Sequence, residues 1–315
     1  MKVKNVVLVR PHIHKTELPF QLHLYDEWIK SGIKNKKSKC PTWRWLFHII
    51  RYLNIPNIYE NKRSAHIVLI SGGSVSWGAW PDSMFYEIIP IIWDCWPLYY
   101  NRVFKFIERN KIRTIVVTAE QTAGVLKTRY PNISIMAITE GIKESLYHEG
   151  DLLVNRRVDL LEYGRPNTNI PTIDMSSLGY IHLKSSKGGK LFPTEKSFLD
   201  TLSDTKVTIV FPRSNTDPVT AGNIETLTQR YWENMLSRVV MIGRAPAELV
   251  NLIGYNPVID IDEKDPSSQI EKVLRNINEY QVLVDKNRYY AIKYSPWRNR
   301  IKNIEDFLEK NGYII

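Results

Sequence analysis

The alternation of two kinds of segment constrains the fold of this 315-residue chain more than any other feature. Short runs rich in valine and isoleucine, typical of buried strands, alternate with longer stretches of helical character. In the first half the expected strands are Asn5–Val9, His66–Ile70, Ile88–Trp93, Thr114–Thr118 and Ile133–Ile138. The expected helices there are Phe20–Ser31, Trp43–Leu53, Tyr99–Asn110 and Gln121–Tyr130. This alternation predicts an α/β fold built on a parallel sheet.

A second alternation follows a polar connector that begins after Glu140-Gly141-Ile142. Its expected strands are Arg157–Tyr163, Tyr180–Leu183, Val207–Phe211, Val239–Ile242 and Val258–Ile261. Its expected helices are Thr194–Leu202, one that begins near Thr226, Ala245–Ile253 and Ser267–Asn278, the last capped by Asp265 with Pro266 in its first turn. We therefore expect two domains of similar size, residues 1–150 and 151–296, and a terminal helix in residues 297–315.

The composition is that of a globular protein, with 43% apolar and 24% charged residues. No stretch approaches the roughly 20 apolar residues that span a bilayer. The apolar run Val6–Val9 near the amino terminus is too short for a signal peptide, so we interpret it as part of the first strand. Cys40 and Cys95 form neither a disulfide framework nor a zinc spacing, which favours a cytoplasmic location.

The formal net charge of +10 favours acidic partners, among them nucleotide phosphates, phosphorylated lipids and an anionic membrane surface. No recognised nucleic-acid motif is present, so we do not expect nucleic acid to be a partner. Basic residues from Arg102 to Arg113 are interleaved with Val103, Phe104, Phe106 and Ile107. This pattern fits either an amphipathic helix resting on a membrane or an ordinary surface helix of an α/β domain.

The segment Lys206–Gly243 carries the clearest chemical signal, a strand, a polar loop, a helix and a second strand. Glu225 stands at the start of the expected helix and Glu233 follows it, which places the two carboxylates roughly 12 Å apart along one element. The free amides and positive dipole end of that helix favour a diphosphate. One acid on each side of a diphosphate suits a nucleotide-sugar, whereas the alternative is two solvated glutamates on an exposed face.

This segment resembles the donor site of GT-B glycosyltransferases, particularly the retaining family 4 type. Pro212-Arg213-Ser214 stands where that family has Pro-Ser, Glu225 and Glu233 match its paired acids, and Thr226-Leu227-Thr228 replaces its Gly-Phe-Gly. Three further segments are similar to family landmarks: Thr139 to Ile142 before the interdomain linker, Leu160 to Arg165 opening the second domain, and Ser295 to Leu308 as a terminal helix crossing back to the first domain. The resemblance implies two Rossmann-like domains whose parallel sheets face each other across a cleft.

The resemblance also implies roles on the donor side. Glu225 would contact the sugar hydroxyls and Glu233 the ribose, while the diphosphate would lie against Arg165, Gly164 and the Thr228 and Gln229 amides, with Arg213 and Ser214 as further donor contacts. The second basic residue of the family has no clear counterpart after Arg165, and Lys184, Lys187 and Lys190 are its candidate substitutes.

On the acceptor side, the strand end IIPIIWDCWP resembles the family's His-Asp-x-Trp. Asp94 and Trp96 match this pattern, but Trp93 stands in place of the histidine, and an indole cannot accept a hydrogen bond as an imidazole can. Asp94 would hold the acceptor or fix its loop, and the alternative is a structural acid that caps the next helix. Gly72, Gly73 and His12 follow expected strands and are further acceptor-side candidates.

The reaction implied is transfer of a sugar from a nucleotide-diphosphate sugar to a glycan or lipid-linked glycan, with retention, no metal and no cofactor, in surface-polysaccharide synthesis. His12 and His14 lack a third ligand, and Asp260 and Asp262 read as a strand end, so we assign no metal. Two alternatives stay open: a catalytically silent subunit that binds a nucleotide-sugar or glycan, and a sugar-nucleotide epimerase. The expected location is the cytoplasm, with peripheral attachment to the inner face of the membrane as the hypothesis that the charge suggests.

Overall fold

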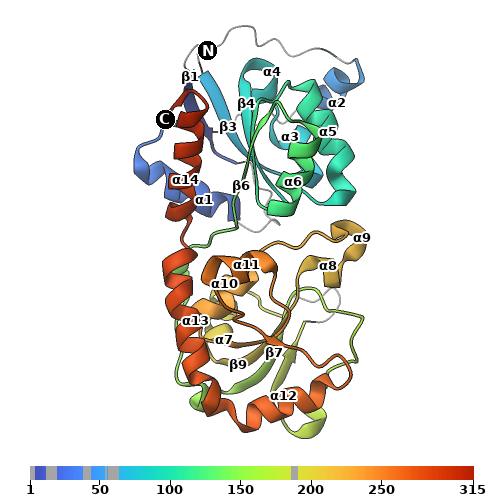
Figure 1. Ribbon diagram of the computed structural model, residues 1–315, viewed down its shortest axis with the longest axis vertical. Helices are drawn as coiled ribbons and strands as arrows, with labels where there is room; N and C mark the ends of the chain where they lie inside the picture. The colour runs from blue at the N-terminus through green and yellow to red at the C-terminus, as the bar shows by residue number, and fades with distance from the viewer. Residues whose placement is uncertain (1–3, 12–19, 38–43, 54, 56–63, 186–190) are drawn as a thin grey trace. The chain divides into compact units, whose positions relative to one another are not determined.

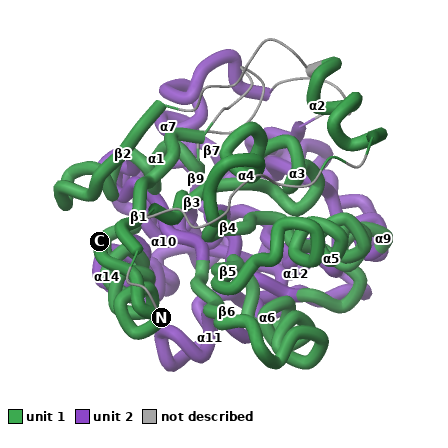
Figure 2. Tube along the Cα trace, turned by 90° about the horizontal axis from the view of Figure 1, so that it is seen from above, with its two compact units in different colours: residues 1–139, 219–224, 297–315 green, residues 140–218, 225–296 purple. Residues whose placement is uncertain are grey.

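The computed structural model describes residues 4–11, 20–37, 44–53, 55, 64–185 and 191–315 (Figure 1). The chain forms two compact units (Figure 2). Unit 1 comprises Met1–Thr139, Val219–Ile224 and Trp297–Ile315, and unit 2 comprises Glu140–Pro218 and Glu225–Pro296. This division falls at Thr139, before the expected domain boundary at residue 150, and it assigns to unit 1 a short segment whose neighbours in sequence belong to unit 2.

Unit 1 is built on a seven-stranded sheet with the order β12-β1-β3-β4-β5-β6, in which β2 also pairs with β1. All of its strand pairs are parallel. The strands are β1 (Lys4–Val9), β2 (Asn35–Lys36), β3 (Ser64–Ser71), β4 (Glu87–Trp93), β5 (Thr114–Val117), β6 (Ser134–Ala137) and β12 (Tyr313–Ile314). Every residue of β4 is buried, as expected of a central parallel strand covered on both faces.

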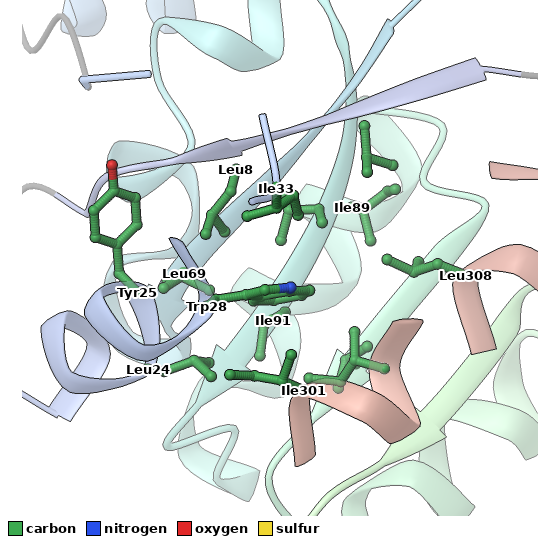
Figure 3. Close-up of a cluster of buried hydrophobic side chains, with 14 of the residues drawn as sticks. Leu8, Leu24, Tyr25, Trp28, Ile33, Leu69, Ile89, Ile91, Ile301 and Leu308 are labelled. Carbon is green, nitrogen blue, oxygen red and sulfur yellow. The ribbon is translucent and has the colours of Figure 1, made fainter. Parts of the chain in front are cut away.

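Helices cover both faces of this sheet. They are α1 (Phe20–Trp28), α2 (Arg44–Tyr52), α3 (Val75–Gly78), α4 (Asp82–Phe85), α5 (Tyr100–Arg109), α6 (Glu120–Arg129) and α14 (Trp297–Lys310). One core brings Trp28 of α1 and Ile301 of α14 against Ile91 of the sheet (Figure 3). A second core packs α5 and α6 against the other face. The last helix of the chain is therefore part of the first unit's core.

Unit 2 repeats this architecture with a five-stranded parallel sheet of order β11-β10-β9-β7-β8. Its strands are β7 (Val158–Glu162), β8 (His182–Lys184), β9 (Thr205–Val210), β10 (Val240–Gly243) and β11 (Ile259–Asp260). Its helices are α7 (Glu195–Ser203), α8 (Arg213–Thr216), α10 (Gln229–Leu236), α11 (Ala247–Ile253), α12 (Pro266–Arg275) and α13 (Gln281–Tyr294), and α9 (Pro218–Ala221) begins at its boundary.

Short 3-10 segments complete the secondary structure. They are Ile29–Ser31, Gly72–Ser74, Pro97–Tyr99, Glu144–Leu146, Leu153–Asn155, Ser176–Leu178 and Ile277–Tyr280. None of the helices in the described part of the chain combines the length and apolar character needed to cross a bilayer.

The expected strands and helices all occur close to their expected bounds, and the cap of α12 is confirmed because the Asp265 side chain accepts from the Ser268 amide. The strands β2 and β12, two residues each, were not expected, and neither were the helices α3, α4, α8, α9 and α13. The helix expected near Thr226 begins only at Gln229. Its delayed start has a physical cause, since the buried Glu248 carboxylate accepts from the Leu227 amide and the Thr226 hydroxyl and so holds those residues outside the helix.

Candidate functional site

The carboxyl ends of the unit 2 strands carry four of the predicted donor-side residues. Gly164 and Arg165 follow β7, Arg213 and Ser214 follow β9, and Arg244 follows β10. Because these strands are parallel, their carboxyl ends meet at one edge of the sheet, where open α/β sheets bind ligands. Arg165 lies exposed at this edge.

Gly164 marks a close approach between this edge and the start of α10. Its φ is 84°, and a Cβ added there would meet the guanidinium of Arg230, the second residue of α10. The Arg230 guanidinium carbon also lies 5.3 Å from the centre of the Tyr163 ring. Glycine is thus required for its conformation and for the space that Arg230 fills. The approach places Arg230 beside the residue that precedes Arg165.

Arg230 is the main residue that the sequence analysis missed. The residue is half-buried, yet its guanidinium donates no hydrogen bond to any residue that the structure describes. A guanidinium carries five N–H donors, and a cation in the first turn of a helix opposes the helix dipole. Both costs are relieved when an anion binds between the side chain and the helix. The available signal was a basic residue four positions after Thr226, near the start of the expected helix.

Glu233 lies inside unit 2 rather than on a solvated helix face. Its Oε1 accepts from the Tyr147 hydroxyl at 3.2 Å and its Oε2 from the Tyr163 hydroxyl at 3.1 Å. Burial raises the pKa of Glu233, and Arg230 and the two hydroxyls lower it, with a net upward shift. Asn234 in turn donates to the Tyr163 hydroxyl at 3.0 Å. This network fixes the carboxylate that was expected to contact a ribose.

Glu225 occupies a different segment from Glu233. It lies in the loop before α10, and its Oε1 pairs with Nη2 of Arg244 at 2.7 Å. The prediction that both carboxylates lie along one helix is therefore wrong, because the Glu248 carboxylate holds the chain before Thr228 outside the helix. The loop position leaves the Glu225 side chain 17% exposed beside a cation.

An internal carboxylate stands at the start of α10, where a diphosphate was expected. Thr228 is the N-cap of the helix, and the Gln229 amide donates to Oε2 of Glu140 at 3.2 Å. The Gln229 side chain donates to the Gly141 carbonyl and the Trp232 indole to the Glu140 carbonyl, both at 2.9 Å. The Gln229 amide can contact a phosphate only if Glu140 moves away.

The two predicted residues after β9 have different surroundings. Nε and Nη2 of Arg213 donate to Oδ2 of Asp217, at 3.1 and 2.8 Å, so this guanidinium is already held by a carboxylate of its own turn. The Ser214 hydroxyl is buried and has no hydrogen-bond partner among the described residues. Lys184, a candidate second cation, pairs with Glu162 at 3.0 Å, whereas Lys187 and Lys190 lie outside the described residues.

Unit 1 brings three of the acceptor-side candidates together. Asp94 follows β4, is exposed, and has a φ of 50°, a left-handed conformation that non-glycine residues adopt rarely and often at functional sites. Its Oδ1 accepts from the Trp96 indole at 2.8 Å. A Cβ on Gly72 would meet the Asp94 carbonyl, so the glycine lets the ends of β3 and β4 touch. The Gly73 carbonyl accepts from Arg102 at 3.1 Å.

Trp93 belongs to the core of unit 1. It is 3% exposed and packs edge-on against Trp297, with ring centres 6.0 Å apart. The ring therefore offers no surface to an acceptor, because the strand alternation points it inward with Ile89 and Ile91. His12 and His14 lie outside the described residues. Burial raises the pKa of the Cys95 thiol to about 12.

No group of three or more His, Cys, Asp or Glu side chains within the described ranges is arranged to hold a metal ion. The arginine side chains at the strand edge of unit 2 can balance the charge of an anionic ligand.

Solved structures share this architecture. Sucrose-phosphate synthase from Thermosynechococcus elongatus is similar over 98% of this chain and 98% of its own, with a TM-score of 0.58 and 10% identity. HepE from Anabaena, in complex with UDP-glucose, is similar over 97% of this chain and 99% of its own, with a TM-score of 0.57 and 7% identity. TarM covers 83% of this chain with a TM-score of 0.51 and 13% identity, and this chain spans 57% of TarM.

No family model matches the chain, and the comparison with curated proteins found no match. The structural similarity extends over nearly the whole chain and both of its parallel sheets. The chain has the two-domain, Rossmann-like GT-B fold, which confirms the fold that its sequence predicted.

Proposed function

We propose that this protein is a glycosyltransferase that moves a sugar from a nucleotide-diphosphate sugar to a hydroxyl of a glycan or lipid-linked glycan. The observation that carries the proposal is the half-buried Arg230. Its guanidinium lies next to Gly164, at the strand edge of a GT-B unit, and donates no hydrogen bond to any described residue. HepE, which shares the fold, has been crystallised with UDP-glucose and with UDP. Uridine nucleotides are therefore the first donors to test.

The arginines supply the main catalytic term in this proposal. Arg230 and Arg165 contact the donor diphosphate, and Arg230 takes the place of the second basic residue that the sequence lacks after Arg165. Charge-assisted hydrogen bonds to the departing diphosphate stabilise the charge that develops as the glycosidic bond breaks. Since the positive charge comes from side chains, the reaction proceeds without a metal.

The remaining roles follow from the surroundings of each residue. Glu225, held by Arg244, contacts hydroxyls of the transferred sugar, and Glu233 accepts from the ribose with lone pairs that its two tyrosines leave open. Asp94 and the Gly72-Gly73 turn hold the acceptor hydroxyl. The donor phosphate takes the acceptor proton, which gives retention without a protein base. The biological setting that we propose is surface-polysaccharide synthesis on the cytoplasmic side of the membrane.

Binding of UDP and UDP-glucose by calorimetry, followed by GDP- and dTDP-sugars, tests the donor site. Arg230→Gln should weaken nucleotide-diphosphate affinity by roughly tenfold to a hundredfold, the magnitude of a charge-assisted hydrogen bond. Arg275→Gln is the matched control, because Arg275 is an exposed unit 2 arginine that pairs with Glu271 on α12. Equal nucleotide affinity in Arg230→Gln and the control would show that Arg230 is not part of the donor site.

Turnover separates the rival functions. Release of nucleotide together with labelled sugar on an acceptor supports transfer. A second candidate, a silent binding subunit, is favoured by the burial of Trp93 and by the Glu140 carboxylate on the Gln229 amide. It predicts nucleotide binding without release. Conversion of the sugar-nucleotide in the absence of any acceptor would instead indicate an epimerase.

A further inference from the structure

Strand β6 forms an outer edge of the unit 1 sheet, where it pairs with β5 on one side. The Ile138 amide, directly after β6, donates to the Val117 carbonyl of β5 at 2.9 Å. Backbone groups of successive strand residues point to alternate sides, so the amides and carbonyls of Ile135 and Ala137 point away from β5. These backbone groups are the ones with which a further strand can pair.

The sequence of β6 does not protect this edge. Proteins commonly protect an edge strand with a charged residue, with a proline or by making it very short. The four residues Ser134–Ala137 include neither a charge nor a proline, whereas the other outer strands of the described sheets, β8, β11 and β12, span three, two and two residues. Among these strands, β6 is therefore the one best suited to pair with another strand.

A groove of about 630 Å³ follows this edge between α6 and α14. Ile135, Met136 and Ala137 line the groove together with Ala123 of α6 and Phe307 of α14. Both views of the fold show β6 between these two helices (Figures 1 and 2). The groove thus lies where the next strand of the sheet would continue it, and its walls include apolar side chains from both helices.

One face of α6 borders this groove. Glu120, Ala123 and Lys127 line the groove, and Gly124 shares their face by helical spacing. Gly124 is exposed and an added Cβ would meet nothing within 4 Å, so the packing of unit 1 does not require a glycine at this position. A glycine inside a helix lowers its stability relative to alanine. A second helix packed closely against this face would explain why the position holds a glycine.

The charges of α6 allow the helix to pair with a copy of itself. Its first turn carries Glu120 and its last turn carries Lys127, and both side chains line the groove. A two-fold axis perpendicular to the sheet makes α6 of a second copy antiparallel, so that the acidic end of each helix lies toward the basic end of the other. This complementarity favours a second copy over an unrelated peptide, because a peptide would satisfy only the strand.

We propose that two copies of this protein associate through their β6 strands, which pair antiparallel about a two-fold axis at Met136. In this register Ile135 of each copy faces Ala137 of the other, and each such pair exchanges both of its backbone hydrogen bonds. The two α6 helices then lie side by side across the axis, with Gly124 at their contact. The proposal does not depend on the transfer reaction or on the identity of the donor.

Sedimentation velocity of the full chain over a micromolar concentration range tests this interface. We expect a monomer–dimer equilibrium, with slower hydrogen exchange of the β6 amides at high concentration than at low concentration. Ala137→Pro removes an amide that β5 does not use and should weaken dimerisation at least about tenfold, because the symmetry makes each copy lose a hydrogen bond. Gly124→Arg should also weaken dimerisation at least about tenfold, because the new side chain occupies the contact between the helices although it favours the helix itself.

Charge reversal distinguishes a second copy from any other partner. Glu120→Lys and Lys127→Glu should each weaken self-association about fivefold, because like charges then meet across the axis. An equal mixture of the two variants should associate more tightly than either variant alone, since each basic end then meets an acidic end of the other variant.

Val282→Arg is the matched control for Gly124→Arg, because it adds the same side chain at a position of α13 that is 78% exposed. This variant should dimerise as the unaltered protein does, and circular dichroism should show that every variant is folded. A chain that stays monomeric at every concentration would overturn the proposal. So would a dimer that Ala137→Pro and Gly124→Arg leave intact, or a mixture of charge variants that associates no more tightly than its components.

Discussion

At the scale of single residues, Glu233 titrates unusually because its carboxyl group is buried, and Arg230 and the two tyrosine hydroxyls offset the effect of burial only in part. Its ordinary pKa is 4.5, and burial raises it. The folded state therefore holds this proton more tightly than the unfolded state does. The stabilisation that results is fully present below about pH 4.5 and is lost as the pH rises through the folded-state pKa.

The substitution Glu233→Gln should remove this loss of stability at rising pH. The free energy of unfolding, measured in urea at several values between pH 4 and pH 8, should fall less steeply with pH in the variant than in the unaltered protein. Glutamine keeps both a donor and an acceptor for the Tyr147 and Tyr163 hydroxyls. Glu309→Gln, at an exposed position of α14, is the control and should leave the slope unchanged. Identical slopes in all three proteins would contradict the raised pKa.

Gly164 allows a second test at this scale, because Gly179 has the same φ of 84° without any neighbour within 4 Å of an added Cβ. Gly164→Ala and Gly179→Ala should each lower the free energy of unfolding by about 1–2 kcal/mol through backbone strain. Only Gly164→Ala displaces the Arg230 guanidinium, so only it should weaken UDP binding. Calorimetry with both variants tests this expectation. Equal UDP affinities would show that Arg230 does not contact the nucleotide.

At the scale of elements, α10 depends on a carboxylate supplied by a distant part of unit 2. Glu140→Ala leaves the buried Gln229 amide without its partner and should cost about 1–2 kcal/mol of unfolding free energy, as for a lost helix cap. Nucleotide-diphosphate affinity should not fall, because the amide becomes available to a phosphate. Glu263→Ala, an exposed acid of the same unit, is the control for chemical denaturation. A stable variant would show that Glu140 does not cap α10.

The elements also show what the sequence could and could not predict. The strands were predictable because parallel strands buried on both faces, such as β4, appear as unbroken apolar runs. The start of α10 was not predictable, because Glu140 and Glu248, which belong to other segments, determine where the helix begins. Arg230 became a candidate only when the fold placed its guanidinium over Gly164. The individual site roles stay predictions, whereas the two-domain fold is confirmed by solved structures.

At the scale of the whole molecule, unit 1 is completed by the last residues of the chain. Trp297 and Ile304 of α14 lie in its core, β12 pairs with β1, and the Tyr313 hydroxyl donates to Oε1 of Glu87 at 2.9 Å. Contacts between neighbours in sequence cannot build this unit, because its first strand and its last helix lie at opposite ends of the sequence. Each unit has its own hydrophobic cores, so a substitution in one core should destabilise its own unit first.

Trp297→Ala should therefore destabilise unit 1 by about 3–5 kcal/mol, the cost of removing a fully buried tryptophan. Hydrogen exchange followed by mass spectrometry should show faster exchange of the β1, β3 and β4 amides, while the β9 and β10 amides keep their protection. Trp232→Ala, which empties a position of the same burial in unit 2, should give the reverse pattern. Trp297→Ala should also retain nucleotide binding, because the proposed donor residues Arg230 and Glu233 belong to unit 2. Equal loss of protection in both units from either substitution would show that the two cores unfold as one.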